Sequence, residues 1–155
     1  MALTTGANHV ALVSDDADRL VAFYTEVFEA SVRWDTHDDG VRTVMIELGP
    51  SFGLHVFEFP DGNPHARGST EMFGRGHLDH LGLDVADAST FELLRQRLVA
   101  YGATDGAVTD FGVSRNVWFE DPDGHGSEIV LWVGAPLRRY RDRIVEKSAA
   151  TPTPP

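Results

Sequence analysis

Two stretches of this sequence, "NHVALVSDDAD" at residues 8–18 and "DHLGLDVADAS" at residues 79–89, follow one pattern. Each places a polar residue before a histidine, then four residues that are mostly apolar, then acidic residues that lead into a helix-like segment. His9 and His80 hold the same position in the two stretches, 71 residues apart in a chain of 155. Self-similarity at a fixed spacing is the signature of repeated architecture, so the sequence predicts a duplicated module.

Each half of the chain predicts one helix among short strands. Strands are expected where β-prone residues run between turn residues, and helices where apolar residues recur at helical spacing. In the first half these are a strand at 9–13, a helix at 16–28, and strands at 31–36, 41–48 and 53–59. In the second half they are a strand at 80–85, a helix at 88–102, and strands at 106–111, 115–121 and 127–133.

The predicted organisation is an α+β chain of two βαβββ modules. The first module covers residues 1–59, a Gly- and Pro-rich linker covers 60–76, and the second module covers 77–134. A short amphipathic C-terminal helix is expected at 135–147, followed by a disordered tail at 148–155.

Composition narrows the possible partners and ligands. The net charge of −11 argues against nucleic-acid binding, which needs a basic surface. No run approaches the roughly 20 apolar residues of a membrane span, and the N-terminus does not read as a signal peptide, so we expect a cytoplasmic protein without a membrane partner. The chain has no cysteine, so any metal site must use histidine and carboxylate ligands.

The two modules can be placed in register through their last strands. Aligning "GLHVFEF" at 53–59 with "GSEIVLW" at 126–132 sets His55 opposite Glu128. His9 precedes His55 by 46 residues, and His80 precedes Glu128 by 48. Each module therefore offers one potential ligand at the start of its first strand and one early in its last strand.

Strand alternation predicts which residues share a face with these histidines. His9 shares its face with Ala11, and His80 shares its face with Gly82. Such small neighbours leave room for a ligand. Phe57 beside His55, and apolar residues beside Glu128, would form an apolar wall around a few polar groups, as in most small-molecule sites.

Over about residues 7–133 the chain resembles the vicinal oxygen chelate superfamily. The motifs that carry the resemblance are "NHVAL…FYTEVF", "DHLGLDV" and "VWFEDPDGHGSEIVLW". This superfamily includes glyoxalase I, methylmalonyl-CoA epimerase, extradiol dioxygenases and the fosfomycin- and bleomycin-resistance proteins. The resemblance implies a curved mixed sheet around a metal-binding cavity, with helices on its outer face. It also implies one divalent ion per site, with His9, His55, His80 and Glu128 as ligands, in a homodimer that binds a small-molecule substrate.

The ligand set leaves the metal and the reaction open. Fe, Ni, Zn, Mn and Co all accept imidazole and carboxylate ligands. In the glyoxalase and epimerase branches the position of His55 usually holds Glu or Gln, and the fosfomycin-resistance branch uses only three protein ligands. The set of three histidines and one glutamate therefore matches neither branch fully.

Three functions follow from the resemblance. The first is a metal-dependent, glyoxalase-type isomerase, epimerase or lyase that chelates vicinal oxygens and uses Glu128 as proton carrier. The second is an extradiol-type dioxygenase with Fe(II), favoured if His55 is not a ligand. The third is a bleomycin-resistance-type protein that binds a drug without catalysis.

Other polar residues are assigned outside the site. The remaining histidines are expected in turns or in the linker: His37, His65, His77 and His125. Glu58 should face away from the ligands, and "DPDG" at 121–124 is a tight-turn sequence rather than acid–base machinery. Arg115 and Asn116 are expected either to face a substrate or to lie only on the surface of the sheet.

Overall fold

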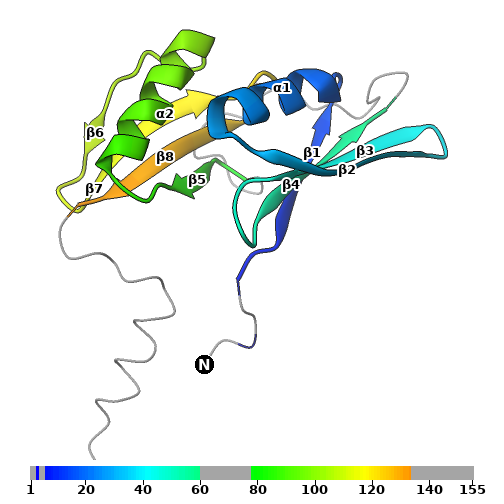
Figure 1. Cartoon of the computed structure of the whole chain (residues 1–155), viewed down its shortest axis with the longest axis horizontal. Helices are drawn as coiled ribbons and strands as arrows, with labels where there is room; N and C mark the ends of the chain where they lie inside the picture. Colours follow the sequence, from blue (N-terminus) through cyan, green and yellow to red (C-terminus); the bar gives the residue numbers. More distant parts are fainter. Residues whose placement is uncertain (1–2, 4–5, 60–77, 134–155) are drawn as a thin grey trace, which may run out of the picture.

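The structure, a computed structural model, describes residue 3 and residues 6–59 and 78–133, which form the same succession of elements twice (Figure 1). The first module contains β1 (His9–Ser14), α1 (Ala17–Phe28), β2 (Ser31–Asp38), β3 (Val41–Glu47) and β4 (Gly53–Glu58). The second contains β5 (Leu81–Asp84), α2 (Ala88–Tyr101), β6 (Thr109–Asp110), β7 (Ser114–Glu120) and β8 (Gly126–Trp132). The predicted α+β fold of two βαβββ modules is confirmed.

Local sequence signals explain where both helices begin and where α2 ends. The Asp16 side chain accepts a hydrogen bond from the backbone N–H of Arg19 at the start of α1, and Asp87 accepts one from Thr90 at the start of α2. These are N-caps, which satisfy backbone donors that a helix leaves free. Gly102, with φ of +81°, ends α2 in the left-handed conformation that glycine adopts without strain.

Each module forms its own four-stranded mixed sheet. The strand orders are β1-β4-β3-β2 and β5-β8-β7-β6, with the first pair parallel and the others antiparallel. The expected curved sheet is thus divided in one chain: among the described residues no ladder joins the two sheets. Consequently β1 and β5 each lie at the edge of a sheet.

A shared core and the two helices hold the modules together. Figure 1 shows α1 and α2 on the same side of the molecule, each above the strands of its own module. Arg97 of α2 donates hydrogen bonds to the carbonyl of Val27 and to the carboxylate of Glu29, at the end of α1. The buried cluster draws on both modules: Leu20, Phe23, Tyr24, Val27, Val44, Ile46, Leu54, Val56, Phe91, Leu98, Val117, Phe119 and Ile129.

Two local expectations were wrong. The strand expected at 106–111 is reduced to the two residues of β6, because Gly106 and Gly112 adopt positive φ values and the Asp110 carboxylate accepts a hydrogen bond from the Gly112 N–H. His37 lies in β2 rather than in a turn, because that strand continues to Asp38 and pairs with Val41.

Several predicted segments lie outside the described residues: the linker at 60–76, the C-terminal helix at 135–147 and the tail at 148–155. His65 and His77 fall there too. Within the described ranges, neither helix is long and apolar enough to cross a membrane.

Candidate metal centre

The strand pairing matches the register expected from the sequence. In the parallel β1–β4 pair Ala11 lies opposite His55, and in the parallel β5–β8 pair Gly82 lies opposite Glu128. The alternation also matches, since Val10 and Leu12 pack toward the core while His9 and Ala11 are exposed. The duplicated backbone therefore places a small residue beside the second candidate ligand of each module.

The first module brings His9 and His55 together. Their ring centroids lie 5.8 Å apart at an interplanar angle of 76°. His55 also contacts Trp34, at 5.9 Å, and Phe57, at 4.3 Å, so an aromatic wall surrounds it. Burial, with the proximity of His9 as the second cause, lowers the pKa of His55 and favours the unprotonated imidazole that binds metals.

The second module brings His80 and Glu128 together. His80 Nε2 lies 3.9 Å from Glu128 Oε1. Two donors bound to one first-row ion at about 2.0–2.2 Å can be separated by no more than about 4.4 Å, so this pair can share an ion. The Trp118 ring lies 5.3 Å from the His80 ring and packs over Gly126, where an added Cβ would come within 2.6 Å of it.

Both repeat-equivalent histidines are held through the same ring nitrogen. His9 Nδ1 lies 2.8 Å from Asn8 Oδ1, and His80 Nδ1 lies 2.7 Å from Asp79 Oδ2. Because these oxygens are acceptors, the Nδ1 atoms donate, and in the neutral tautomer that makes this bond Nε2 carries the lone pair. A histidine that binds a metal ion usually donates its other ring N–H to an oxygen, which orients the ring.

Three imidazoles and one carboxylate suit a divalent first-row metal ion, but the four side chains do not lie together in a single chain. In the described part of the chain, no group of three or more His, Asp or Glu side chains is placed to hold an ion. The structure brings His9 to His55 and His80 to Glu128, and it leaves the two pairs on separate sheets. Each pair is half of the predicted ligand set.

The ligand-bearing faces are open in the single chain. Val13, Trp34 and Trp132, on the strands of these faces, are 42%, 38% and 39% exposed. Val13 follows His9 on its face of β1, and Trp132 follows Glu128 on its face of β8. Trp132 also donates a hydrogen bond to Asp84, at the end of β5.

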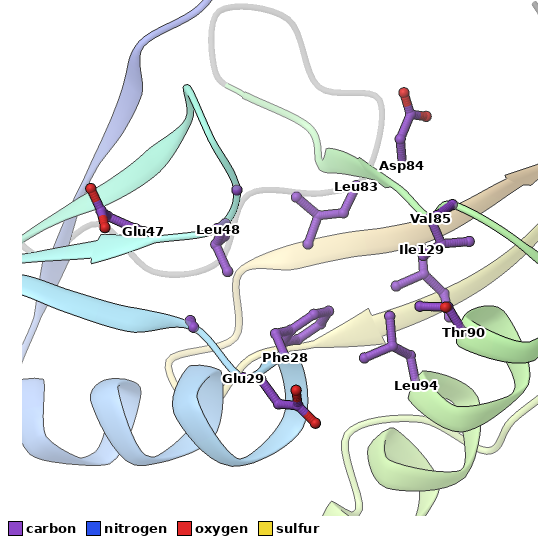
Figure 2. A pocket seen from close by; sticks show the side chains of 13 residues that line it. Phe28, Glu29, Glu47, Leu48, Leu83, Asp84, Val85, Thr90, Leu94 and Ile129 are labelled. Carbon is purple, nitrogen blue, oxygen red and sulfur yellow. The ribbon is translucent and has the colours of Figure 1, made fainter.

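A pocket of about 310 Å³ at the seam between the modules is not this site (Figure 2). Its wall includes Phe28 at the end of α1, Leu48 after β3 and Leu94 of α2, with Leu83 and Ile129 from the core-facing side of the second sheet. None of the four candidate ligands lines it. The pocket therefore lies on the helix side of the sheets, away from the histidines.

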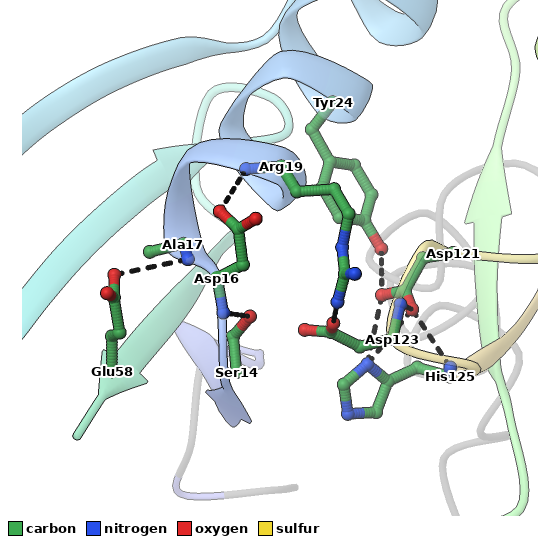
Figure 3. Close-up of polar contacts among 9 residues, drawn as sticks. All are labelled: Ser14, Asp16, Ala17, Arg19, Tyr24, Glu58, Asp121, Asp123 and His125. Carbon is green, nitrogen blue, oxygen red and sulfur yellow. Dashed lines mark hydrogen bonds and ion pairs between the residues drawn. The ribbon is translucent and has the colours of Figure 1, made fainter. Parts of the chain in front are cut away.

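Sequence reasoning missed a buried polar network that joins the modules (Figure 3). Tyr24 of α1 donates to Asp121 Oδ2 at 3.1 Å, and His125 Nδ1 lies 3.0 Å from the same carboxylate. Arg19 of α1 pairs with Asp123 in the same turn. Contact with Asp121 raises the pKa of His125, and burial raises the pKa of Tyr24. Tyr24 at a core-facing helix position was the available signal, because a buried phenol needs a partner.

Sequence reasoning also left the partners of the candidate ligands unassigned. Asn8 and Asp79 were visible as the polar residue before each histidine, although the sequence could not show that they contact the ring. Asn116 donates from Nδ2 to Glu128 Oε2 at 2.8 Å, a contact that depends on strand register.

The fold is a duplicated βαβββ module, and each module holds one pair of candidate metal ligands, His9–His55 and His80–Glu128, called the donor pairs below. These features define a two-module protein of the vicinal oxygen chelate type. The chain belongs to the Glyoxalase/Bleomycin resistance protein/Dioxygenase superfamily, whose sequence profile matches residues 6–129.

Individual relatives agree with this assignment. The chain is 28% identical, over 87% of its own length and 84% of the relative's, to a 2-epi-5-epi-valiolone epimerase of an Actinomyces species. It superposes with a TM-score of 0.68 on a glyoxylase/bleomycin resistance protein/dioxygenase domain from Frankia, at 24% identity, covering 83% of this chain and 98% of that one. A fosfomycin resistance protein from Listeria monocytogenes, complexed with Mn(II), shares the fold at 17% identity and a TM-score of 0.61, covering 92% and 99% of the two chains.

Proposed function

We propose that this protein is a metal-dependent enzyme that carries out redox-neutral proton transfer on a small substrate with two adjacent oxygens. The observation that carries the proposal is the repeated donor pair. His9 and His80 occupy equivalent positions, and each is held through Nδ1 so that Nε2 is free to bind an ion. The relative named as an epimerase supports an isomerase-type reaction, which needs no net oxidation.

We infer that two copies of the chain build each site. The His9–His55 pair of one copy would meet the His80–Glu128 pair of a second copy and complete the set of four. Three features support this arrangement: the pairs lie on separate sheets, β1 and β5 are edge strands, and apolar side chains beside the ligands are exposed. An isologous dimer of this kind would contain two identical sites and would cover both open faces.

The roles of the residues follow from their contacts. A bound divalent ion supplies Lewis-acid polarisation of the substrate oxygens. Glu128 would release Oε1 from the ion, take a proton through it from the carbon beside one substrate oxygen and deliver that proton to the adjacent carbon, while Asn116 keeps hold of the other oxygen, Oε2. Once the second copy covers these faces, the aromatic residues around the pairs, Trp34, Phe57 and Trp118, would exclude water from the reacting atoms.

The position of His55 favours this reaction over ring cleavage. His55 lies beside His9 rather than elsewhere on its sheet, as a fourth ligand should. Four protein ligands on an octahedral ion leave two positions, which suffice for a chelating substrate but not for O₂ as well. A site without His55 would instead resemble the two-histidine, one-carboxylate centres of iron oxygenases.

Mixing two inactive variants tests the shared site. His9→Ala and His80→Ala chains, unfolded together and refolded, form mixed dimers in which one site has lost both histidines and the other has lost neither. The mixture should regain bound metal and activity toward a quarter of the wild-type value, since half of the dimers are mixed and each has one intact site of two. Recovery should be absent when each variant is refolded alone. If the mixture dimerised normally but recovered neither bound metal nor activity, the shared site would be excluded.

A substrate screen with and without air tests the reaction class. Acyl-CoA epimers, cyclic polyol epimers and adducts of 2-oxoaldehydes with thiols should be tried beside catechols. The expected result is turnover of a redox-neutral class that continues without oxygen. Oxygen consumption coupled to catechol cleavage would establish a dioxygenase instead. Tight binding of a cationic antibiotic without turnover of any class would establish drug sequestration.

A further inference from the structure

The environment of Asn116 identifies a further residue of the candidate site. Asn116 lies on β7, two residues before Trp118 and on the same face of the strand. Trp118 pairs with Glu128 of β8. It is only 7% exposed, and its amide nitrogen donates to Glu128 Oε2 at 2.8 Å. The other carboxylate oxygen, Oε1, is the one nearest His80 Nε2.

The other end of the Asn116 amide has no partner in the described part of the chain. Its Oδ1 atom is buried and accepts no hydrogen bond there. Buried side-chain polar atoms in folded proteins are nearly always paired, so an asparagine kept only for packing would be expected to satisfy both ends. Leucine has nearly the same shape and would leave no unpaired oxygen. The amide is therefore explained by the hydrogen bond that it donates to Glu128.

We propose that Asn116 is a positioning residue that fixes Glu128 through Oε2 and so presents Oε1 on the side of His80. This inference rests on the proposed function, in which Glu128 is a metal ligand and proton carrier. Without the amide, the carboxylate could rotate, and its two oxygens would become equivalent. A carboxylate restrained in this way loses less conformational freedom when it binds an ion.

The first module supplies a matched control. Thr43 on β3 occupies the position equivalent to Asn116, because Met45 lies opposite His55 as Trp118 lies opposite Glu128. The Thr43 hydroxyl, however, bonds to the hydroxyl of Thr36 at 3.1 Å rather than to a candidate ligand. Thr43→Val therefore removes a polar group at the same place in the sheet without touching a donor pair.

The test compares Co(II) binding and thermal unfolding of the full chain in five proteins: wild type, Asn116→Leu, Thr43→Val, Glu128→Ala and the double variant Asn116→Leu/Glu128→Ala. Asn116→Leu should weaken Co(II) binding, measured by calorimetry, by about 10- to 100-fold. Its metal-free melting temperature should be equal or higher, because a buried unpaired oxygen is removed. Thr43→Val should leave Co(II) affinity unchanged. In the Glu128→Ala background, Asn116→Leu should cause no further loss, since its effect passes through Glu128.

Each alternative outcome overturns a distinct claim. Unchanged Co(II) affinity in Asn116→Leu overturns the role of Asn116 and leaves the proposed function standing. A lower melting temperature, with equal loss of affinity in both backgrounds, shows a merely structural residue. A wild-type protein that binds no Co(II) overturns the proposed function and this inference together.

A measurement on the metal-free protein covers the case in which Asn116→Leu does not fold. The side-chain amide protons of Asn116, observed by NMR, should exchange slowly in the wild type and faster in Glu128→Ala. Identical exchange in both proteins would show that the bond to Glu128 does not hold the amide.

Discussion

The two donor pairs occupy equivalent backbone positions but differ in charge. In the first module the pair consists of two imidazoles, His9 and His55, and His9 is held by an amide, Asn8. In the second module the pair includes a carboxylate, Glu128, and His80 is held by another, Asp79. The second module thus provides the negative charge that a divalent cation needs, whereas the first provides nitrogen ligands in an aromatic setting.

The turns before β4 and β8 also differ in charge, and again the charged side chains lie in the second module. Leu48 and Phe52 of the first module form the same backbone hydrogen bond as Asp121 and His125 of the second, at 3.0 Å and 3.1 Å. The first turn packs apolar side chains against the core, whereas the second buries a carboxylate that binds Tyr24. The two modules therefore share a backbone arrangement, but at the compared positions only the second module carries carboxylates, Glu128 in the ligand pair and Asp121 in the turn.

The largest effect is expected when a ligand of the second module is removed. His80→Ala should abolish tight binding of the ion, because it removes the imidazole whose basicity Asp79 increases. His55→Ala should weaken binding by about 10- to 100-fold and leave a measurable site. Metal analysis and calorimetry on both variants give the comparison.

His37→Ala is the control, since this exposed histidine on β2 lies outside both pairs. Full metal stoichiometry in His80→Ala would show that the ligands were assigned wrongly. Unchanged affinity in His55→Ala would reduce the set to three ligands and favour the dioxygenase.

The next effect concerns turnover. Glu128→Gln keeps an oxygen donor but cannot carry a proton, so turnover should fall by about 10²- to 10⁴-fold while much of the metal remains. Glu120→Gln, an exposed position at the end of β7, is the matched control and should keep full activity. Parallel losses of metal and turnover in Glu128→Gln would make Glu128 only a ligand.

The two modules should also differ in their tolerance of a methyl group at equivalent glycines. An alanine Cβ at Gly53 would lie 2.6 Å from the backbone oxygen of Ile46, whereas at Gly126 it would lie 2.6 Å from the ring of Trp118. A side chain can move more easily than backbone. Gly53→Ala should therefore destabilise by about 2–3 kcal/mol, and Gly126→Ala by about 1 kcal/mol.

Chemical denaturation of the two variants measures this difference. Gly126→Ala should in addition weaken metal binding, because the displaced Trp118 ring contacts His80. If Gly126→Ala proved the more destabilising of the two, Trp118 would have to be as rigid as the backbone.

Within the described residues, the sequence predicted the helices, most of the strands, the repeat and the register, because these depend on local periodicity and on residues repeated in order. His55 and Glu128 could be aligned because both last strands begin with glycine. The sequence could not predict that the sheets are separate, since the pairing of β1 or β5 with a further strand depends on long-range packing. It also missed the bonds of Asn116 and Asp121, because each joins residues of different elements whose contact depends on tertiary structure.

The smallest expected effect is a pH dependence confined to the charged turn of the second module. The His125 imidazole faces the carboxylate of Asp121 and the charge of Asp123, and these raise its pKa above the ordinary value of about 6.5. The folded protein therefore binds the proton more tightly than the unfolded chain. The resulting stability is fully present below about pH 6.5 and is lost as pH rises through the folded-state pKa of His125.

Urea unfolding between pH 5.5 and 8.5 should show this loss in the wild type. His125→Asn keeps a donor for Asp121 but does not titrate, so the difference between the two proteins should shrink as pH rises. Phe52→Leu, at the equivalent position of the uncharged turn, should show the wild-type pH dependence. A pH dependence in His125→Asn equal to that of the wild type would place the titrating group elsewhere in the chain.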